Sequence, residues 1–168
     1  MVYTNEEHWH AVHIRSRHEK KVCHDLCRRD VETFLPLVTV PSSRRDRRAE
    51  YDRPLFPGYL FVQISRDRAW DVIDTKGVVR ILGPRSWEYS VVPEQQIESV
   101  RTLVESKVKL DPFAELKVGR VVRIKRGLLR GVEGQLIERR GQARIVVAVD
   151  LLGKAVTADI DADDAEAI

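Results

Sequence analysis

Polar and apolar positions alternate near the start of the chain, over residues 8–15, and this alternation predicts a β-strand. Apolar residues then recur at helical spacing, which predicts a helix over about residues 18–29. Ser16 is expected to cap this helix, with Glu19 three residues on as its capping-box partner. The chain therefore begins with a strand followed by an amphipathic helix.

The middle of the chain passes through strands, turns and short helices. Residues 41–53 are rich in arginine and nearly free of apolar side chains, which indicates a loop or a hairpin tip. The turn at Pro57-Gly58 leads into a dense apolar strand. Pro93 is expected to start a helix, because proline is tolerated at a first helical position. Strands are expected over residues 31–35, 54–64 and 78–82, and helices over residues 67–74 and 93–107.

The pattern changes after the last of these helices. Residues 109–117 have no clear period and predict a linker, after which short strands alternate with glycines. Such a run of short strands is typical of a small barrel, whereas the first part mixes strands and helices irregularly, which favours an α+β sandwich. We therefore predict an α+β domain over residues 5–108 and an all-β domain over residues 118–168. The strands of the second domain are expected over residues 121–125, 132–138, 144–149 and 155–160.

Side chains of the second domain divide by their expected position in the barrel. We expect its interior to hold Val122, Ile124, Val132 and Leu136. We expect its exterior to hold Arg123, Lys125, Arg126 and Arg130.

Charge distinguishes the second domain more than it distinguishes the whole chain. The chain has a formal net charge of +3, but residues 117–158 hold ten basic and three acidic residues, a net charge of +7. A small basic unit favours nucleic acid or acidic partners, although a solvated charged surface has the same composition. No apolar run is long enough to span a membrane, and the N-terminus lacks the pattern of a secretory signal. We therefore expect a cytoplasmic protein.

Catalytic and metal-binding patterns do not emerge from the sequence. There is no phosphate loop, nucleophile elbow or GxGxxG motif. The histidines cluster near Cys23 and Cys27, but they alternate along a strand or surround a helix instead of converging at finger-like spacing. We expect no enzyme activity, no cofactor and no metal, and we interpret both cysteines as small apolar residues in a reducing compartment. The histidines are His8, His10, His13, His18 and His24.

Two motifs in fixed order resemble the NusG family. The first is PLFPGYLFV, Pro54 to Val62, and the second is VGRVVRIKRGLLRGVEGQL, Val118 to Leu136, which resembles the KOW motif. The resemblance implies an NGN-type α/β sandwich with an antiparallel sheet, followed by a small KOW barrel. It also implies a transcription elongation or antitermination factor that binds RNA polymerase and reduces pausing or termination. A ribosome- or RNA-binding KOW protein without a polymerase role explains the second motif but not the first.

The resemblance assigns a polymerase-binding role to the aromatic strand. Tyr59 and Phe61 are two residues apart and share one face of that strand, while Leu60 and Val62 point to the other face and into the core. The alternative is that these aromatic side chains simply belong to the core. The residues that the resemblance implies in contact with the polymerase clamp helices are Trp9, His13, Phe56, Pro57, Tyr59 and Phe61.

Basic positions outside the aromatic strand match sites where specialised family members meet non-template DNA. Single-stranded DNA binding usually combines a basic groove with stacking surfaces, and the alternative is a solvated helix face. The matching positions are Arg15, Arg28, Arg29 and Lys76. A second basic group, which we interpret mainly as a solubilising loop tip, is Arg44, Arg45, Arg47 and Arg48.

The opening WHAVHIRSRHEK resembles the specialised RfaH-like and UpxY-like antiterminators most. In housekeeping NusG the KOW partner loop reads like Ile-Phe-Gly-Arg, and it is implied in binding the ribosome or the termination factor Rho. Here that loop is Leu151, Leu152, Gly153 and Lys154, without the aromatic residue. RfaH-like proteins also use a polar motif to contact the polymerase gate loop, and the matching segment, Arg68-Ala69-Trp70, does not preserve it.

Overall fold

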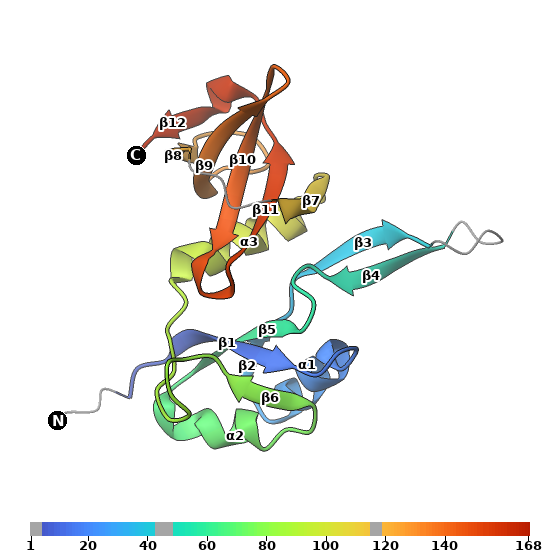
Figure 1. Ribbon diagram of the computed structural model, residues 1–168, viewed down its shortest axis with the longest axis vertical. Helices are drawn as coiled ribbons and strands as arrows, with labels where there is room; N and C mark the ends of the chain where they lie inside the picture. Colours follow the sequence, from blue (N-terminus) through green and yellow to red (C-terminus); the bar gives the residue numbers. More distant parts are fainter. Residues whose placement is uncertain (1–4, 43–48, 115–118) are drawn as a thin grey trace. The chain divides into compact units, whose positions relative to one another are not determined.

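The computed structural model describes residues 5–42, 49–114 and 119–168, and the chain forms two compact units (Figure 1). The first unit spans Met1–Val92 and the second spans Pro93–Ile168. In the described part of the chain, no helix has the length and apolar character needed to cross a membrane.

The first unit is a mixed α/β structure built on an antiparallel sheet. The sheet has the strand order β2-β5-β1-β6, so its central strands are β5 and β1. The β3–β4 hairpin leaves this sheet as a separate ribbon (Figure 1). The elements are β1 (His8–Ile14), α1 (Glu19–Arg28), β2 (Glu32–Phe34), β3 (Leu37–Pro41), β4 (Glu50–Pro54), β5 (Tyr59–Ile64), the 3-10 turn η1 (Arg66–Arg68), α2 (Ala69–Ile73) and β6 (Val78–Ile81).

One face of this sheet packs against the helices. Leu60 and Val62 of β5 are buried there, together with Val22 and Leu26 of α1 and Val72 of α2. This confirms the expected direction of Leu60 and Val62, because residues two apart on a strand share a face. Tyr59 and Phe61 are consequently on the opposite face.

The predicted capping box at the start of α1 is wrong. The N-cap is His18, without a side-chain capping bond among the described residues, and the carboxylate of Glu19 instead accepts the backbone N–H of Gly58 at 2.9 Å. Glu19 is buried, and Gly58 has a φ of 84°, a conformation that glycine adopts without strain. The carboxylate is thus used to fix the Pro57-Gly58 turn and not to cap the helix.

Part of the predicted loop over residues 41–53 is strand. β3 and β4 pair in register from Leu37 opposite Pro54 to Pro41 opposite Glu50. The expectation of a hairpin is confirmed, and Pro41 and residues 50–53 belong to its strands. The four arginines of the predicted tip, Arg44, Arg45, Arg47 and Arg48, lie outside the described residues.

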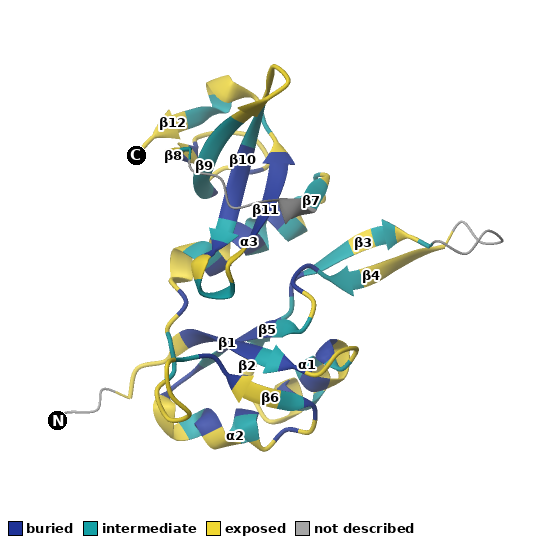
Figure 2. Ribbon diagram, viewed as in Figure 1, coloured by how far each residue is buried: buried dark blue, intermediate teal, exposed yellow. Residues whose placement is uncertain are grey.

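The second unit combines one helix of the described residues, α3 (Glu94–Glu105), with an antiparallel sheet in the order β12-β8-β9-β10-β11-β7. This confirms the all-β character of the C-terminal part and its predicted strands. Figure 2 shows the buried residues concentrated in β10 and β11. The strands and turns are β7 (Leu110–Ala114), β8 (Arg120–Ile124), β9 (Glu133–Arg139), β10 (Gln142–Val149), η2 (Asp150–Leu152), β11 (Lys154–Asp159), η3 (Ala162–Asp164) and β12 (Ala165–Ala167).

Strand β7 corrects the expectation of an irregular segment over residues 109–117. Leu110 pairs with Ala158 and Asp111 with Thr157, so residues 110–114 extend the sheet at its edge. An edge strand tolerates proline, which explains how a segment containing Pro112 can be a strand.

The barrel-filling residues follow the prediction with one exception. Val122, Ile124 and Val132 are buried, but Leu136 is only half-buried and lines a surface cavity of about 720 Å³. The basic residues that we predicted outside, Arg123, Lys125, Arg126 and Arg130, are exposed.

Helix α3 belongs to the second unit and packs against β9 and β10. The hydroxyl of Ser99 accepts the backbone N–H of Glu133 at 3.1 Å, and the Gln96 amide donates to the Asp150 carboxylate at 2.8 Å. The sequence placed this helix in the first domain, whereas the two compact units divide after Val92. The domain limits of 5–108, 109–117 and 118–168 remain predictions.

Candidate functional site

An aromatic face occupies the side of the first sheet opposite α1 and α2. Strands β1 and β5 pair so that His13 is opposite Tyr59, and their rings stack with centroids 5.4 Å apart. Phe61 packs between Phe34, at 6.1 Å, and Phe56, at 6.2 Å and a right angle. These residues, with Trp9 and Pro57, form what we call the aromatic face.

Burial divides the aromatic face into two parts. Trp9, Phe56 and Phe61 are buried, which agrees with the interpretation that they belong to the core. His13 and Tyr59 are half-buried, and Pro57 is exposed. A partner approaching the first unit could therefore touch His13, Pro57 and Tyr59 directly, while the buried rings fix their positions.

His10 lies on β1 and is also buried. Its Nδ1 is 2.9 Å from the carbonyl oxygen of Ser90, and its ring meets Tyr89 edge-on at 6.2 Å. Burial lowers the pKa of His10 below the ordinary value of 6.5; the contact with the Ser90 carbonyl partly opposes this shift, and the nearby His8 adds to it. His10 is therefore a neutral structural residue near pH 7.

No metal centre is formed by the described residues: no three His, Cys, Asp or Glu side chains gather closely enough to hold an ion. Cys23 and Cys27 are free cysteines on α1. Burial raises the pKa of the Cys23 thiol to about 11, with a further contribution from Cys27. Cys23 is therefore a thiol and not a reactive thiolate at neutral pH.

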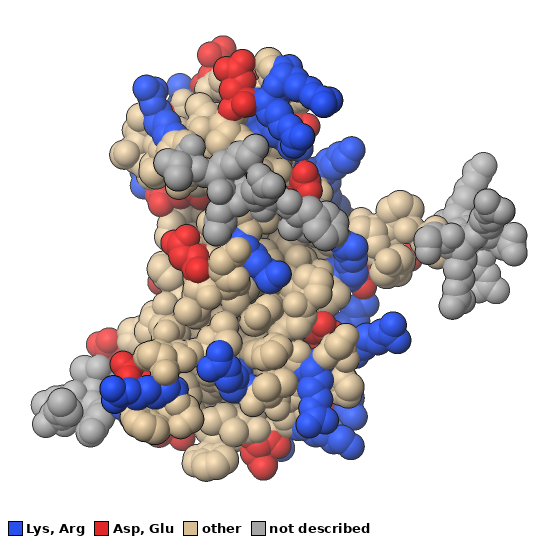
Figure 3. Space-filling model, in the orientation of Figure 1, with Lys and Arg blue, Asp and Glu red and all other residues tan. Residues whose placement is uncertain are grey.

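A basic cavity lies where α1 ends and α2 meets β6. It has a volume of about 410 Å³, and it brings together Arg28, Arg29 and Lys76, three of the four positions that the resemblance implies in DNA binding. Figure 3 shows Lys and Arg side chains gathered over the part of the first unit where α1 lies. We call this the basic cavity; its lining residues are Asp25, Arg28, Arg29, Asp74, Thr75 and Lys76.

Arg15, the fourth member of the predicted set, is exposed at the end of β1. Its backbone N–H donates to the carbonyl of Gly77 at 2.9 Å, which places Arg15 next to the segment that carries Lys76. Its side chain is not among the described residues that line the basic cavity.

The two carboxylates of the basic cavity reduce its charge without neutralising it. Arg29 lies 3.6 Å from the Asp74 carboxylate, and both side chains are well exposed. Exposed ion pairs of this kind contribute little in water, about 0–1 kcal/mol. Arg29 can therefore exchange Asp74 for a phosphate at small cost.

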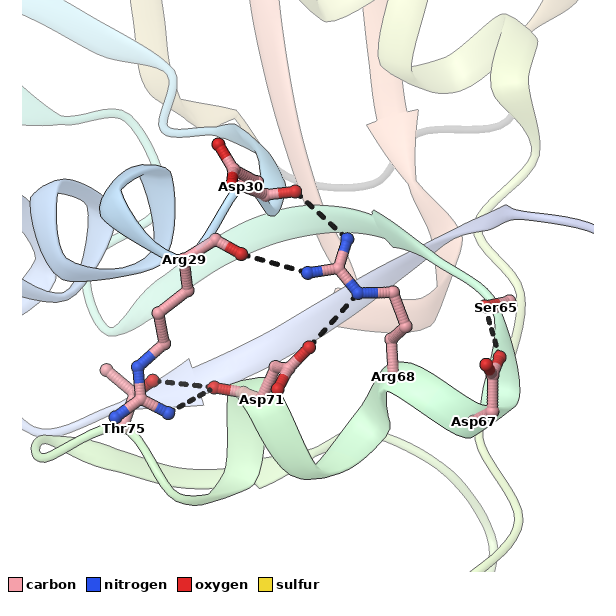
Figure 4. Close-up of polar contacts among 7 residues, drawn as sticks. All are labelled: Arg29, Asp30, Ser65, Asp67, Arg68, Asp71 and Thr75. Atoms are coloured by element: carbon pink, nitrogen blue, oxygen red, sulfur yellow. Dashed lines mark hydrogen bonds and ion pairs between the residues drawn. The ribbon is translucent and has the colours of Figure 1, made fainter.

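Arg68 holds together the segments that line the basic cavity, although it does not line the cavity itself (Figure 4). Sequence reasoning missed this role. Its guanidinium donates to the carbonyls of Arg29 and Asp30, both at 2.9 Å, and to the Asp71 carboxylate at 3.0 Å. It thus ties the end of α1 to α2. The spacing to Asp71 could have suggested a helical pair, but nothing in the sequence links Arg68 to carbonyls 38 and 39 residues away.

Asp71 completes this brace through its backbone. Its carbonyl accepts Nη1 of Arg29 at 3.2 Å and the hydroxyl of Thr75 at 2.8 Å. Arg29 and the segment that leads to Lys76 are therefore anchored to the same turn of α2.

The predicted partner loop of the second unit is a tight turn. Leu151 and Leu152 are half-buried in η2, while Gly153, with a φ of 61°, and Lys154 are exposed. The exposed surface of this loop is thus polar and small, without an aromatic side chain.

Comparisons with known proteins match this chain to one family over most of its length. The family model described as "Transcription termination factor nusG" matches residues 7–101. The "Transcription termination/antitermination protein NusG" of Lactococcus lactis is 26% identical, over 97% of this chain and 94% of that protein. The protein of the same description from Pseudomonas aeruginosa is 24% identical, over 95% and 98%.

A solved structure described as "Domain interaction in Thermotoga maritima NusG" aligns over 97% of this chain and 98% of its own. The TM-score is 0.56 and the sequence identity 19%. This likeness supports the fold: a mixed α/β unit followed by a unit in which one helix, α3, packs on an antiparallel sheet.

Proposed function

We propose a function from one premise: the chain belongs to the NusG family, whose model matches residues 7–101. The names of its relatives support a role as a transcription factor. In our proposal it binds RNA polymerase through the first domain and reduces pausing or termination. It works by binding alone and is not an enzyme.

The aromatic face is the observation that carries the proposal. The half-buried rings of His13 and Tyr59, beside the exposed Pro57, suit an apolar helix pair, and the resemblance assigns that role to the clamp helices of the polymerase. His13, Pro57 and Tyr59 offer the accessible contacts. Aromatic side chains held rigidly in place are strong interface anchors.

The basic cavity supports a second contact, with non-template DNA. Arg28, Arg29 and Lys76 would hold phosphates, and Arg15 lies along the same end of the first unit. A transcription factor bound to the clamp and to DNA would favour the elongating polymerase by differential binding, because it binds that conformation better.

The second domain would recruit a further partner through a tethered site. Its loop at Leu151 to Lys154 lacks the aromatic residue of housekeeping NusG, which supports a specialised member of the RfaH-like or UpxY-like type. We therefore propose weak or absent Rho stimulation, and the ribosome as a candidate partner of this domain.

The test is binding of the full chain to purified RNA polymerase. Tyr59→Asp places a charge in the aromatic face and should weaken binding by more than about 1 kcal/mol, the loss of one aromatic anchor. Tyr51→Asp is the matched control, because Tyr51 is half exposed on β4, outside the aromatic face.

Circular dichroism establishes that both variants are folded, and a pausing assay follows. We expect Tyr51→Asp to relieve pausing as the unmodified chain does, and Tyr59→Asp to fail. Equal polymerase binding by the two folded variants would refute the assignment of the aromatic face.

A further inference from the structure

Trp70 is the most exposed aromatic side chain of the described residues, with 73% of its surface accessible. It lies on α2, whose buried side consists of Ala69 and Val72. A tryptophan on the solvent side of a short helix exposes a large apolar surface that the first unit does not use for its own core. The resemblance matches this position to the polar gate-loop motif of RfaH-like proteins, which a tryptophan does not preserve.

Helical geometry places Trp70 beside the basic cavity. The backbone N–H of Asp74 donates to the carbonyl of Trp70 at 2.9 Å, so the two residues are one helical turn apart. Side chains at i and i+4 are neighbours on a helix surface. Asp74 lines the basic cavity, so Trp70 lies one helical turn from a lining residue, just outside the cavity itself.

The brace around Arg68 fixes this arrangement (Figure 4). Residues on both sides of Trp70 are anchored: Arg68 to the end of α1, and Asp71 to Arg29 and Thr75. The flat ring is therefore carried on a backbone that is tied to the same arginine that lines the cavity.

We propose that Trp70 is a stacking surface for an unpaired base of the DNA strand whose phosphates are held by Arg28, Arg29 and Lys76. This inference rests on the proposed DNA contact and adds the chemical group that would be recognised. Proteins that hold single-stranded nucleic acid combine a basic groove with aromatic rings on which bases stack. The cationic neighbours favour a nucleic acid strand over an apolar protein segment as the occupant.

The inference predicts which part of the DNA each residue recognises. Trp70 would contact a base and contribute nothing through charge, whereas Arg28 and Lys76 would contact phosphates. The slope of log K against log salt is negative, and neutralising two phosphate contacts on a single strand makes it less steep by about 1.4. Removing a stacking ring lowers affinity at every salt concentration and leaves the slope unchanged.

The experiment measures binding of the full chain to a labelled single-stranded oligodeoxythymidylate by fluorescence anisotropy. Trp70→Ala should weaken binding by about fivefold or more, since stacking contributes about 1–3 kcal/mol per base. Trp70→Phe should keep most of the affinity. Trp87→Ala is the matched control, an exposed tryptophan of the same unit that lies outside α2, and it should bind normally.

An oligonucleotide of abasic sites carries the same phosphates without bases, so Trp70→Ala should not weaken its binding. A loss of abasic binding equal to the loss on thymidylate would overturn the stacking role, as would normal thymidylate binding by Trp70→Ala. Reduced polymerase binding by Trp70→Ala with normal oligonucleotide binding would assign the ring to a protein partner instead.

The failure of the wider proposal gives a different result. If the double variant Arg28→Gln, Lys76→Gln binds thymidylate with unchanged affinity and an unchanged salt slope, the proposal that the basic cavity binds DNA is refuted. If that variant loses affinity while Trp70→Ala does not, only the stacking surface is wrong.

Discussion

The aromatic face and the basic cavity lie in the same unit but are built in different ways. The aromatic face is formed by strand pairing, with His13 opposite Tyr59 and buried rings packed around Phe61. The basic cavity is formed where helix ends meet, and hydrogen bonds from Arg68 and Arg29 hold it together. One site depends on apolar burial and the other on polar contacts that water can partly replace.

This difference determines how each site should respond to mutation. A change in a buried ring removes packing that the whole sheet uses, so folding and binding are lost together. A change at the basic cavity leaves the core intact, so it alters DNA binding and the salt dependence of that binding more than it alters the free energy of unfolding. Variants that separate these effects test the comparison directly.

The largest effect is expected for Phe61→Ala. Phe61 is fully buried between Phe34 and Phe56, and truncating a buried phenylalanine costs about 3–5 kcal/mol. Urea denaturation followed by circular dichroism measures the free energy of unfolding. Trp87→Ala, an exposed ring in the same unit, should change it by no more than about 0.5 kcal/mol. A loss below 1 kcal/mol for Phe61→Ala would mean that the rings are loosely packed.

A middle-sized effect is expected for Arg68→Gln. Its hydrogen bonds to Asp71 and to the two carbonyls that follow α1 are lost. For partly exposed charged groups this lowers the free energy of unfolding by about 1–2 kcal/mol. Arg68→Lys should not restore the stability, since an ammonium group cannot reproduce the guanidinium fork. Oligonucleotide binding should weaken in both variants, although Arg68 does not line the basic cavity.

Arg101→Gln is the matched control for this brace. Arg101 forms an ion pair with Glu98 at the same i,i+3 spacing, and its side chain has the same 32% exposure as that of Arg68. An exposed pair of this type contributes about 0.3–0.5 kcal/mol. Equal losses of stability from Arg68→Gln and Arg101→Gln would show that the contacts of Arg68 with α1 are unimportant.

The same comparison explains what the sequence could and could not predict. Strand β5 was predictable because alternation sends Leu60 and Val62 to one face and Tyr59 and Phe61 to the other, a local rule with period two. Most helices and strands followed from such patterns. The burial of Phe56 and Phe61 was open, because a period of two assigns faces without revealing which face is covered.

Contacts between distant segments were the part that local patterns missed. Glu19 has the right spacing for a capping box with Ser16, but its carboxylate instead accepts the backbone N–H of Gly58, 39 residues away. Arg68 was judged only by its neighbours in the sequence, whereas it also donates to carbonyls in the turn that follows α1. Backbone carbonyls carry no residue-specific signal, so no motif could have indicated that brace.

The smallest effect concerns pH and the helix-covered side of the sheet, where His10 is paired with Val62. His10 is buried with its Nδ1 near the Ser90 carbonyl, and burial lowers its pKa below 6.5, with His8 contributing less. At His10, the unfolded chain therefore binds more protons than the folded chain as the pH falls below 6.5. The stability that neutral His10 contributes is present above that pH and is lost as pH falls through the lowered pKa.

His10→Gln keeps an amide near Ser90 but does not titrate, so its free energy of unfolding should fall less steeply below pH 6.5 than that of the unmodified chain. His8→Gln removes only the lesser cause of the lowered pKa and should flatten the pH dependence by a smaller amount. Urea denaturation at a series of pH values measures both slopes. The basic cavity holds no histidine among its described lining residues, so oligonucleotide binding should be the same for both variants at pH 7. Parallel stability curves for His10→Gln and the unmodified chain would show that His10 is protonated equally in the folded and unfolded states. That result would contradict a pKa lowered by burial.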